Sequence, residues 1–189
     1  VQMGIYGMLV VTAAGGGPYA GIGAPAQQVT LLFSEIDPAI HDAADDEAMA
    51  APTPTIPSTN DFKPKYFLIN GKAFPANNPI PIGAAGSTTL LRFANAGLDT
   101  YVPLLHGQYM QVIAEDGYLK VANLRFSRYS VDLHAGKTFD ALLTNPGTAG
   151  YLPLYDRRLY LSNADQAPGG MMAYLEVGGP GSSTLTVAT

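Results

Sequence analysis

The chain has 189 residues, a formal net charge of −5 and no cysteine. Hydrophobic residues make up 47% and charged residues 13%, with 21 glycines and 15 prolines, a composition typical of a compact, turn-rich all-β domain. The lack of cysteine excludes disulfides and thiolate metal ligands, and the acidic balance with dispersed basic residues disfavours nucleic acid as a partner.

The first residues predict a strand followed by a linker. Residues 3–12, MGIYGMLVVT, are apolar and rich in β-forming side chains, whereas residues 13–27 contain five glycines and two prolines. A strand directly before a linker has no neighbour in sequence with which to pair. We therefore interpret residues 1–12 as the closing strand of a preceding domain, and expect it to be frayed or packed elsewhere in the isolated chain.

The domain itself is expected over residues 28–177. Gln28–Phe33 predicts a strand with Val29, Leu31 and Phe33 on its inner face. Residues 36–64 are Pro-rich and acidic, and predict an insertion with a helical turn around Pro38–Met49. The Gly-, Ser- and Thr-rich residues 178–189 predict a second linker.

Short strands separated by turns fill the rest of the domain. Asn70-Gly71 and Asp116-Gly117 are typical of tight hairpin turns, because both pairs tolerate positive φ angles. This pattern favours a Greek-key β-sandwich or barrel of about seven or eight strands. The predicted strands after the insertion are Tyr66–Ile69, Lys72–Phe74, Thr88–Ala94, Met110–Ala114, Tyr118–Val121, Tyr129–Leu133, Thr138–Leu143, Gly150–Leu154 and Met171–Val177.

The sequence predicts no catalytic, cofactor-binding or metal-binding residue. His41, His106 and His134 are far apart in sequence and form no His-x-His pair, so each is expected to be structural, although folding could still bring them together. The acidic residues 42–47 lack the spacing of a calcium loop, and the glycines at 15–17 lack the Gly-Lys-Ser/Thr ending of a phosphate loop. No apolar run approaches the roughly 20 residues that span a bilayer, so we expect no membrane insertion.

Four blocks, YFLINGKAF (66–74), TTLLRFANAG (88–97), HGQYMQVIAEDG (106–117) and HAGKTFDALL (134–143), resemble in this order the middle cupredoxin domain of bacterial three-domain multicopper oxidases, the laccase-like group. MGIYGMLVV likewise resembles the last strand of the first oxidase domain. The resemblance implies a cupredoxin-like fold and a non-catalytic spacer, with copper only in the parent oxidoreductase, which reduces dioxygen. It also implies a periplasmic or secreted location and, as partners, flanking cupredoxin domains or copies of the chain.

Two charged residues within these blocks have a structural interpretation that needs no family. Arg92 is expected to pair with a carboxylate, and Asp140 to fix a hairpin, because charges in apolar strands need partners.

Other functions remain open at this point. The chain could be a free-standing, copper-free β-sandwich module that binds a partner through Tyr151, Tyr155 and Tyr160, although these tyrosines could equally belong to the core or to cross-strand pairs. A small metal-storage or metal-delivery protein would require ligands to converge.

Overall fold

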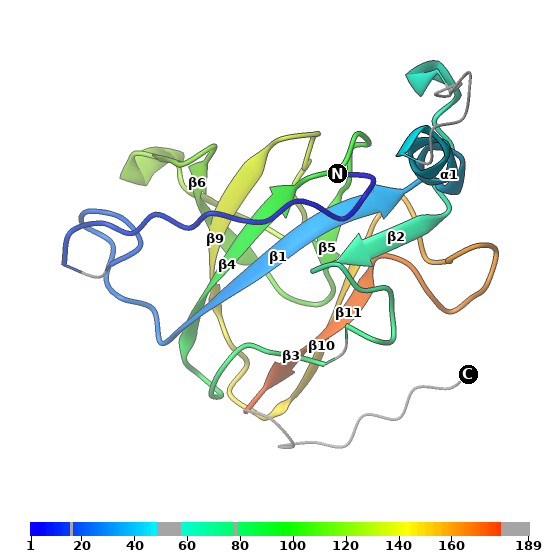
Figure 1. Ribbon diagram of the computed structural model, residues 1–189. Coiled ribbons are helices and arrows are strands. Elements are labelled where there is room, and N and C mark those ends of the chain that lie inside the picture. Colours follow the sequence, from blue (N-terminus) through cyan, green and yellow to red (C-terminus); the bar gives the residue numbers. More distant parts are fainter. Residues whose placement is uncertain (16, 49–57, 78, 179–189) are drawn as a thin grey trace.

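The computed structural model describes residues 1–15, 17–48, 58–77 and 79–178. They form two mixed sheets that pack as a β-sandwich, so the predicted all-β sandwich is confirmed (Figure 1). The larger sheet has the order β2-β1-β4-β9-β6-β7, with β8 also paired to β6, and the smaller has the order β3-β11-β10-β5. The strands are β1 (Gln27–Ile36), β2 (Tyr66–Ile69), β3 (Ile80–Pro81), β4 (Thr88–Asn95), β5 (Pro103–Leu105), β6 (Met110–Glu115), β7 (Tyr118–Leu119), β8 (Phe126–Arg128), β9 (Thr138–Thr144), β10 (Gly150–Asp156) and β11 (Met172–Val177).

The number of strands depends on how very short ones are counted. The described residues form eleven strands, of which seven have four residues or more. The other four, β3, β5, β7 and β8, have two or three residues. So few residues cannot show a period-two pattern, which explains why the sequence does not predict β3 and β5.

Strand β1 shows how the sequence places the core. Val29, Leu31 and Phe33 are buried, whereas Gln28 and Thr30 are exposed, as the alternation predicts. The three apolar side chains join inward-facing residues of both sheets in one hydrophobic cluster. Strand β1 lies between β2, with which it is antiparallel, and β4, with which it is parallel.

Both predicted hairpin turns are present. Asn70 and Gly71 have φ angles of 54° and 73°, and the Asn70 side chain also accepts a hydrogen bond from the Leu32 backbone N–H at 2.9 Å. Asp116 and Gly117, at 49° and 79°, join β6 to β7. The predicted return strand Lys72–Phe74 is wrong, because only an isolated bridge between Ile69 and Lys72 follows the first turn.

The predicted strand Tyr129–Leu133 is displaced. The strand is β8, which ends at Arg128 and pairs with β6 in the larger sheet. Residues 129–133 then form isolated bridges with residues 101–105, which include β5 of the smaller sheet. The chain therefore passes from one sheet to the other within a few residues, and this change of partner interrupts the ladder.

The insertion contains the predicted helix. Helix α1 spans Pro38–Ala48, and the Asp37 carboxylate before it accepts hydrogen bonds from the backbone N–H groups of Ala39 (2.9 Å) and Lys63 (2.7 Å). Short 3₁₀ turns follow at Thr59–Asp61 and Ala122–Leu124. Residues 49–57 of the insertion, and all but the first residue of the predicted linker 178–189, lie outside the described residues. None of the helices in the described part is long and apolar enough to cross a bilayer.

Residues 3–12, predicted to be a strand that is frayed or packed elsewhere in the isolated chain, form no strand here. This segment runs across the outer face of the larger sheet without joining it (Figure 1). The Tyr6 hydroxyl and the Ser34 hydroxyl are 2.5 Å apart, and the Gln2 side chain accepts a hydrogen bond from the Asp37 N–H at 2.8 Å. Residues 7–12 form no backbone hydrogen bond with any other described residue. An apolar, β-forming run needs a partner strand to form a ladder, and none of the described strands pairs with this one. The assignment of residues 1–12 to a preceding domain stays a prediction.

Candidate functional site

The structure gives each histidine a different environment. His41 Nδ1 is 3.3 Å from the backbone oxygen of Gln2, and His134 Nδ1 is 3.1 Å from the Thr100 hydroxyl. His106 Nδ1 is 3.5 Å from the hydroxyl of Tyr155. Within the described ranges, no three His, Asp or Glu side chains are grouped closely enough to hold a metal ion. The histidines are thus not brought together, and the absence of a copper site in this chain stays a prediction.

A buried ion pair lies at the centre of the larger sheet. Arg92 on β4 and Asp140 on β9 are opposite each other in the antiparallel register, and Nη1 donates to Oδ2 at 2.8 Å. The side chains are 6% and 7% exposed. Arg92 therefore has the carboxylate partner expected from the sequence, and that partner is Asp140 within a strand, not at a hairpin.

Two further polar side chains complete this pair, and we call the four residues the Arg92 network. Gln28 Oε1 accepts hydrogen bonds from Arg92 Nε at 3.3 Å and Nη2 at 3.1 Å, and the Tyr19 hydroxyl donates to Asp140 Oδ2 at 2.7 Å. Sequence reasoning missed both Gln28 and Tyr19. The only signal for Tyr19 is that it is the one aromatic residue in the Gly- and Pro-rich segment 13–27.

Burial dominates the electrostatics of the Arg92 network. It raises the pKa of Asp140, against the opposing effects of the Tyr19 hydrogen bond and the Arg92 charge. Burial, followed by the hydrogen bond to Asp140, also raises the pKa of Tyr19 well above its ordinary range. Tyr19 is therefore a permanent hydrogen-bond donor at physiological pH. Its ring packs with Ile22 on the outer-face cluster of Leu90, Ile113 and Ala114, so the network fixes the linker to the sheet.

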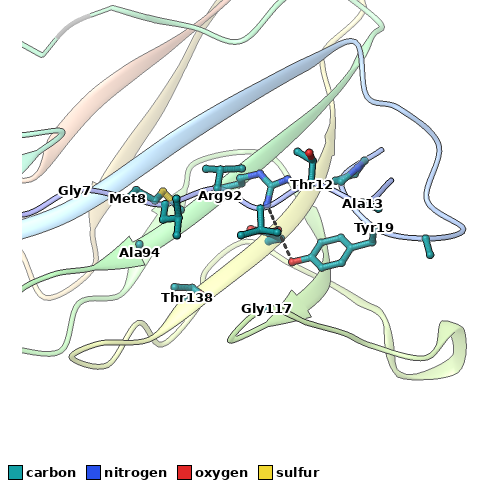
Figure 2. A pocket seen from close by; sticks show the side chains of 15 residues that line it. Gly7, Met8, Thr12, Ala13, Tyr19, Arg92, Ala94, Gly117 and Thr138 are labelled. Atoms are coloured by element: carbon teal, nitrogen blue, oxygen red, sulfur yellow. Dashed lines mark hydrogen bonds and ion pairs between the residues drawn. The ribbon is translucent and has the colours of Figure 1, made fainter. Parts of the chain in front are cut away.

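A cleft of about 510 Å³ separates the amino-terminal segment from the sheet. Residues 7–13 form one wall, and Arg92, Ala94, Thr138 and Asp140 line the other (Figure 2). Arg92 and Asp140 on the floor of the cleft are already engaged with each other and with Gln28 and Tyr19 in the Arg92 network. The cleft is therefore best described as space left between residues 7–13 and the larger sheet.

The outward side of the amino-terminal segment is apolar. Tyr6 and Met8 face the sheet and are half-buried, whereas alternate side chains point away from it. Ile5, Leu9 and Val11 are 86%, 89% and 75% exposed. Such a continuous exposed apolar row is typical of a surface that another protein surface covers.

The tyrosines considered as a partner surface are engaged within the domain. Tyr160 stacks on Phe67 with ring centroids 4.3 Å apart and packs against the core. The Tyr151 ring is edge-on to Tyr174 of the neighbouring strand, at 6.4 Å. These two tyrosines therefore pack within the sandwich, and a partner surface formed by Tyr151, Tyr155 and Tyr160 stays a prediction.

A second buried carboxylate was missed by sequence reasoning. Glu35 at the end of β1 is fully buried, and it accepts hydrogen bonds from the Tyr101 hydroxyl and from the backbone N–H of Leu98, the latter at 2.5 Å. Burial, then the charge of Glu35, raises the pKa of Tyr101 far above its ordinary range. A Cβ atom at Gly97 would lie 1.8 Å from a Glu35 carboxylate oxygen, so this contact requires glycine.

Comparison with known proteins identifies related folds. The family model described as multicopper oxidase matches residues 29–167, which is more than half of the chain. A blue copper oxidase from Nitrosomonas europaea superimposes with a TM-score of 0.64 at 23% identity, over 79% of this chain and 43% of that protein. The multicopper oxidase mgLAC gives 0.62 at 21% identity, over 85% and 45%.

A laccase from B. aclada, in its L499M variant, gives a TM-score of 0.61 at 15% identity, over 88% of this chain and 31% of that protein. The chain thus spans less than half the length of each of these three solved structures. A search of curated proteins gave no significant match. The structural matches show a shared fold, whereas the match to the family model shows that the sequence itself is related to the family.

Proposed function

Because this chain belongs to the multicopper oxidase family, we propose that it is a non-catalytic cupredoxin domain that stands between copper-binding domains of a larger oxidoreductase. In that parent enzyme, dioxygen would be the electron acceptor and copper would reside in the flanking domains. The ordered blocks between residues 66 and 143 support the middle position, since they resemble that domain within the family. The same resemblance supports a periplasmic or secreted location.

The observation that carries this proposal is the apolar outward row of the amino-terminal segment. Residues 7–12 have β-forming side chains and, within the described structure, no backbone hydrogen bonds. Ile5, Leu9 and Val11 present their side chains to solvent. A neighbouring cupredoxin domain would supply a surface that covers these side chains and a strand with which the backbone of residues 7–12 could pair.

The donor set of the chain does not fit a type 1 copper site. A type 1 copper needs a thiolate and two imidazoles, and the sequence has no cysteine. Each of the three histidines contacts a different group of the domain, which supports the proposal. We therefore assign the chain no step of the oxidase reaction.

A copper titration followed by gel filtration and metal analysis tests this assignment. The chain is expected to retain no more copper than its His106→Ala and His134→Ala variants do. Stoichiometric copper that is lost in both variants would instead establish a metal-binding protein.

Sedimentation velocity tests the spacer role. A domain lacking its neighbour should self-associate through the exposed row, and Ile5→Ser, Leu9→Ser and Val11→Ser together should shift it towards monomer. Leu159→Ser is the control, because Leu159 is 67% exposed and follows β10 of the smaller sheet, whereas the row crosses the larger sheet. A native chain that stays monomeric at high concentration would contradict the proposal and favour a free-standing binding module.

A further inference from the structure

Exposed large apolar side chains gather in a second place, separate from the amino-terminal segment. Within residues 109–129, Tyr109 is 66% exposed, Tyr118 81%, Phe126 40% and Tyr129 41%, and Val121 and Leu124 are also exposed. These residues belong to β6–β8 and the short turns around them. Aromatic residues concentrated at one sheet edge are typical of protein interfaces.

Strand β8 is an open edge of the larger sheet. Among the described strands it pairs only with β6, in the register Met110 to Arg128. All three of its residues are exposed. An exposed edge presents backbone donors and acceptors to which an extended segment of another protein can add as a further strand.

A cleft of about 340 Å³ beside β8 adds a charge preference to this edge. The rings of Tyr109 and Tyr129 meet edge to face at 6.1 Å, and Arg157 lies 6.0 Å from the centre of the Tyr129 ring. Arg128, also in the cleft, lies 4.3 Å from the centre of the Phe126 ring. We call these five residues the β8 edge surface.

The two guanidinium groups of the β8 edge surface have no carboxylate partner among the described residues. Asp132 also lines the cleft, but it is exposed and forms no ion pair with either arginine. Two arginines against one aspartate leave a local positive charge on a chain whose net charge is −5. Arginines stacked on aromatic rings keep their planar donors free for carboxylates.

We propose that the β8 edge surface binds an extended acidic segment of a partner protein. The backbone of that segment pairs with β8, its carboxylates bind Arg128 and Arg157, and its remaining side chains pack on the tyrosines. This proposal is independent of the spacer role, because it concerns a different edge of the sandwich. A polypeptide is favoured over a free small ligand, because only a polypeptide can both pair with the backbone of β8 and reach the two arginines and the tyrosines.

The probe is a blocked synthetic hexapeptide that alternates threonine with glutamate, titrated into the ¹⁵N-labelled chain and followed by NMR. We expect amide shifts confined to β6, β8 and residues 129–133. The Arg128→Gln/Arg157→Gln double variant should bind at least about tenfold more weakly, since it loses the charge-assisted hydrogen bonds to the glutamates. Lys72→Gln is the matched control, because it makes the same change in charge per substitution at an exposed site outside the surface.

Three outcomes would overturn the proposal. The first is equal binding of a hexapeptide in which glutamine replaces glutamate. The second is unchanged affinity in the double variant, with its fold verified by circular dichroism. The third is self-association of the native chain that the double variant abolishes, which would assign the surface to a second copy of the chain.

Discussion

The buried pair of Arg92 and Asp140 provides a sharp test of how this sheet is held together. Both side chains are almost fully buried and directly opposed, so removal of either one leaves a charge in an apolar sheet. We expect Arg92→Met and Asp140→Leu each to lower the free energy of unfolding by about 3–5 kcal/mol. The total stability of such a domain is about 5–15 kcal/mol, so each loss is a large fraction of it.

The double variant Arg92→Met/Asp140→Leu should recover most of this loss, because it leaves no unpaired charge and fills the space with apolar atoms of similar length. Urea unfolding of the four proteins gives the coupling energy between the two positions. The control is the partly exposed pair of Glu115 and Lys120, 2.7 Å apart, whose coupling should stay below about 1 kcal/mol. Additive losses at Arg92 and Asp140 would refute the reasoning, since they would show that neither charge depends on the other.

Two further predictions follow from contacts elsewhere in the domain. Gly97→Ala should destabilise the fold by about 1–3 kcal/mol, because the added methyl meets the Glu35 carboxylate, which is fully buried and held by hydrogen bonds from Tyr101 and Leu98. Gly147→Ala, with open space around it, should change stability by less than about 0.5 kcal/mol. Equal effects in thermal unfolding would contradict the steric argument. Glu115→Gln addresses pH: hydrogen bonds from two lysines lower the pKa of Glu115, so its contribution is present above the ordinary value of 4.5 and disappears as the pH falls through the lowered folded-state pKa. The stability difference between native chain and variant should be at most about 1 kcal/mol at neutral pH and vanish in acid, and a difference that persists there would show that it is not electrostatic.

Local patterns in the sequence predict those parts of the fold that depend on neighbouring residues. The alternation of Val29, Leu31 and Phe33 identifies the inner face of β1, and Asn70-Gly71 identifies a turn, because each depends on the residue itself and its immediate neighbours. Residues 3–12 have equally good β-forming side chains but form no strand, because a strand also needs a partner. Propensity alone cannot show whether that partner is present.

The same limit applies to the buried polar groups. The sequence indicates that Arg92 needs a carboxylate, but only the register of β4 against β9 identifies Asp140 as the one that meets it. Tyr19 is 121 positions away from Asp140, and no local pattern connects the two. Glu35 on β1 and Gly97 in the loop after β4 likewise meet only in the folded chain, so their contact has no signature in the sequence.

The distribution of polar and apolar side chains on the surface bears on the two external contacts proposed above. The Arg92 network and Glu35 satisfy buried charges with partners from within the chain, and their hydrogen bonds hold the linker and loops in place. Most of the large apolar side chains that remain exposed belong to the amino-terminal segment or to the region of β6–β8. A random distribution would expose such side chains singly over the whole surface. Their concentration in two places therefore supports both proposals: that the amino-terminal segment contacts a neighbouring domain, and that the edge at β8 contacts a partner protein.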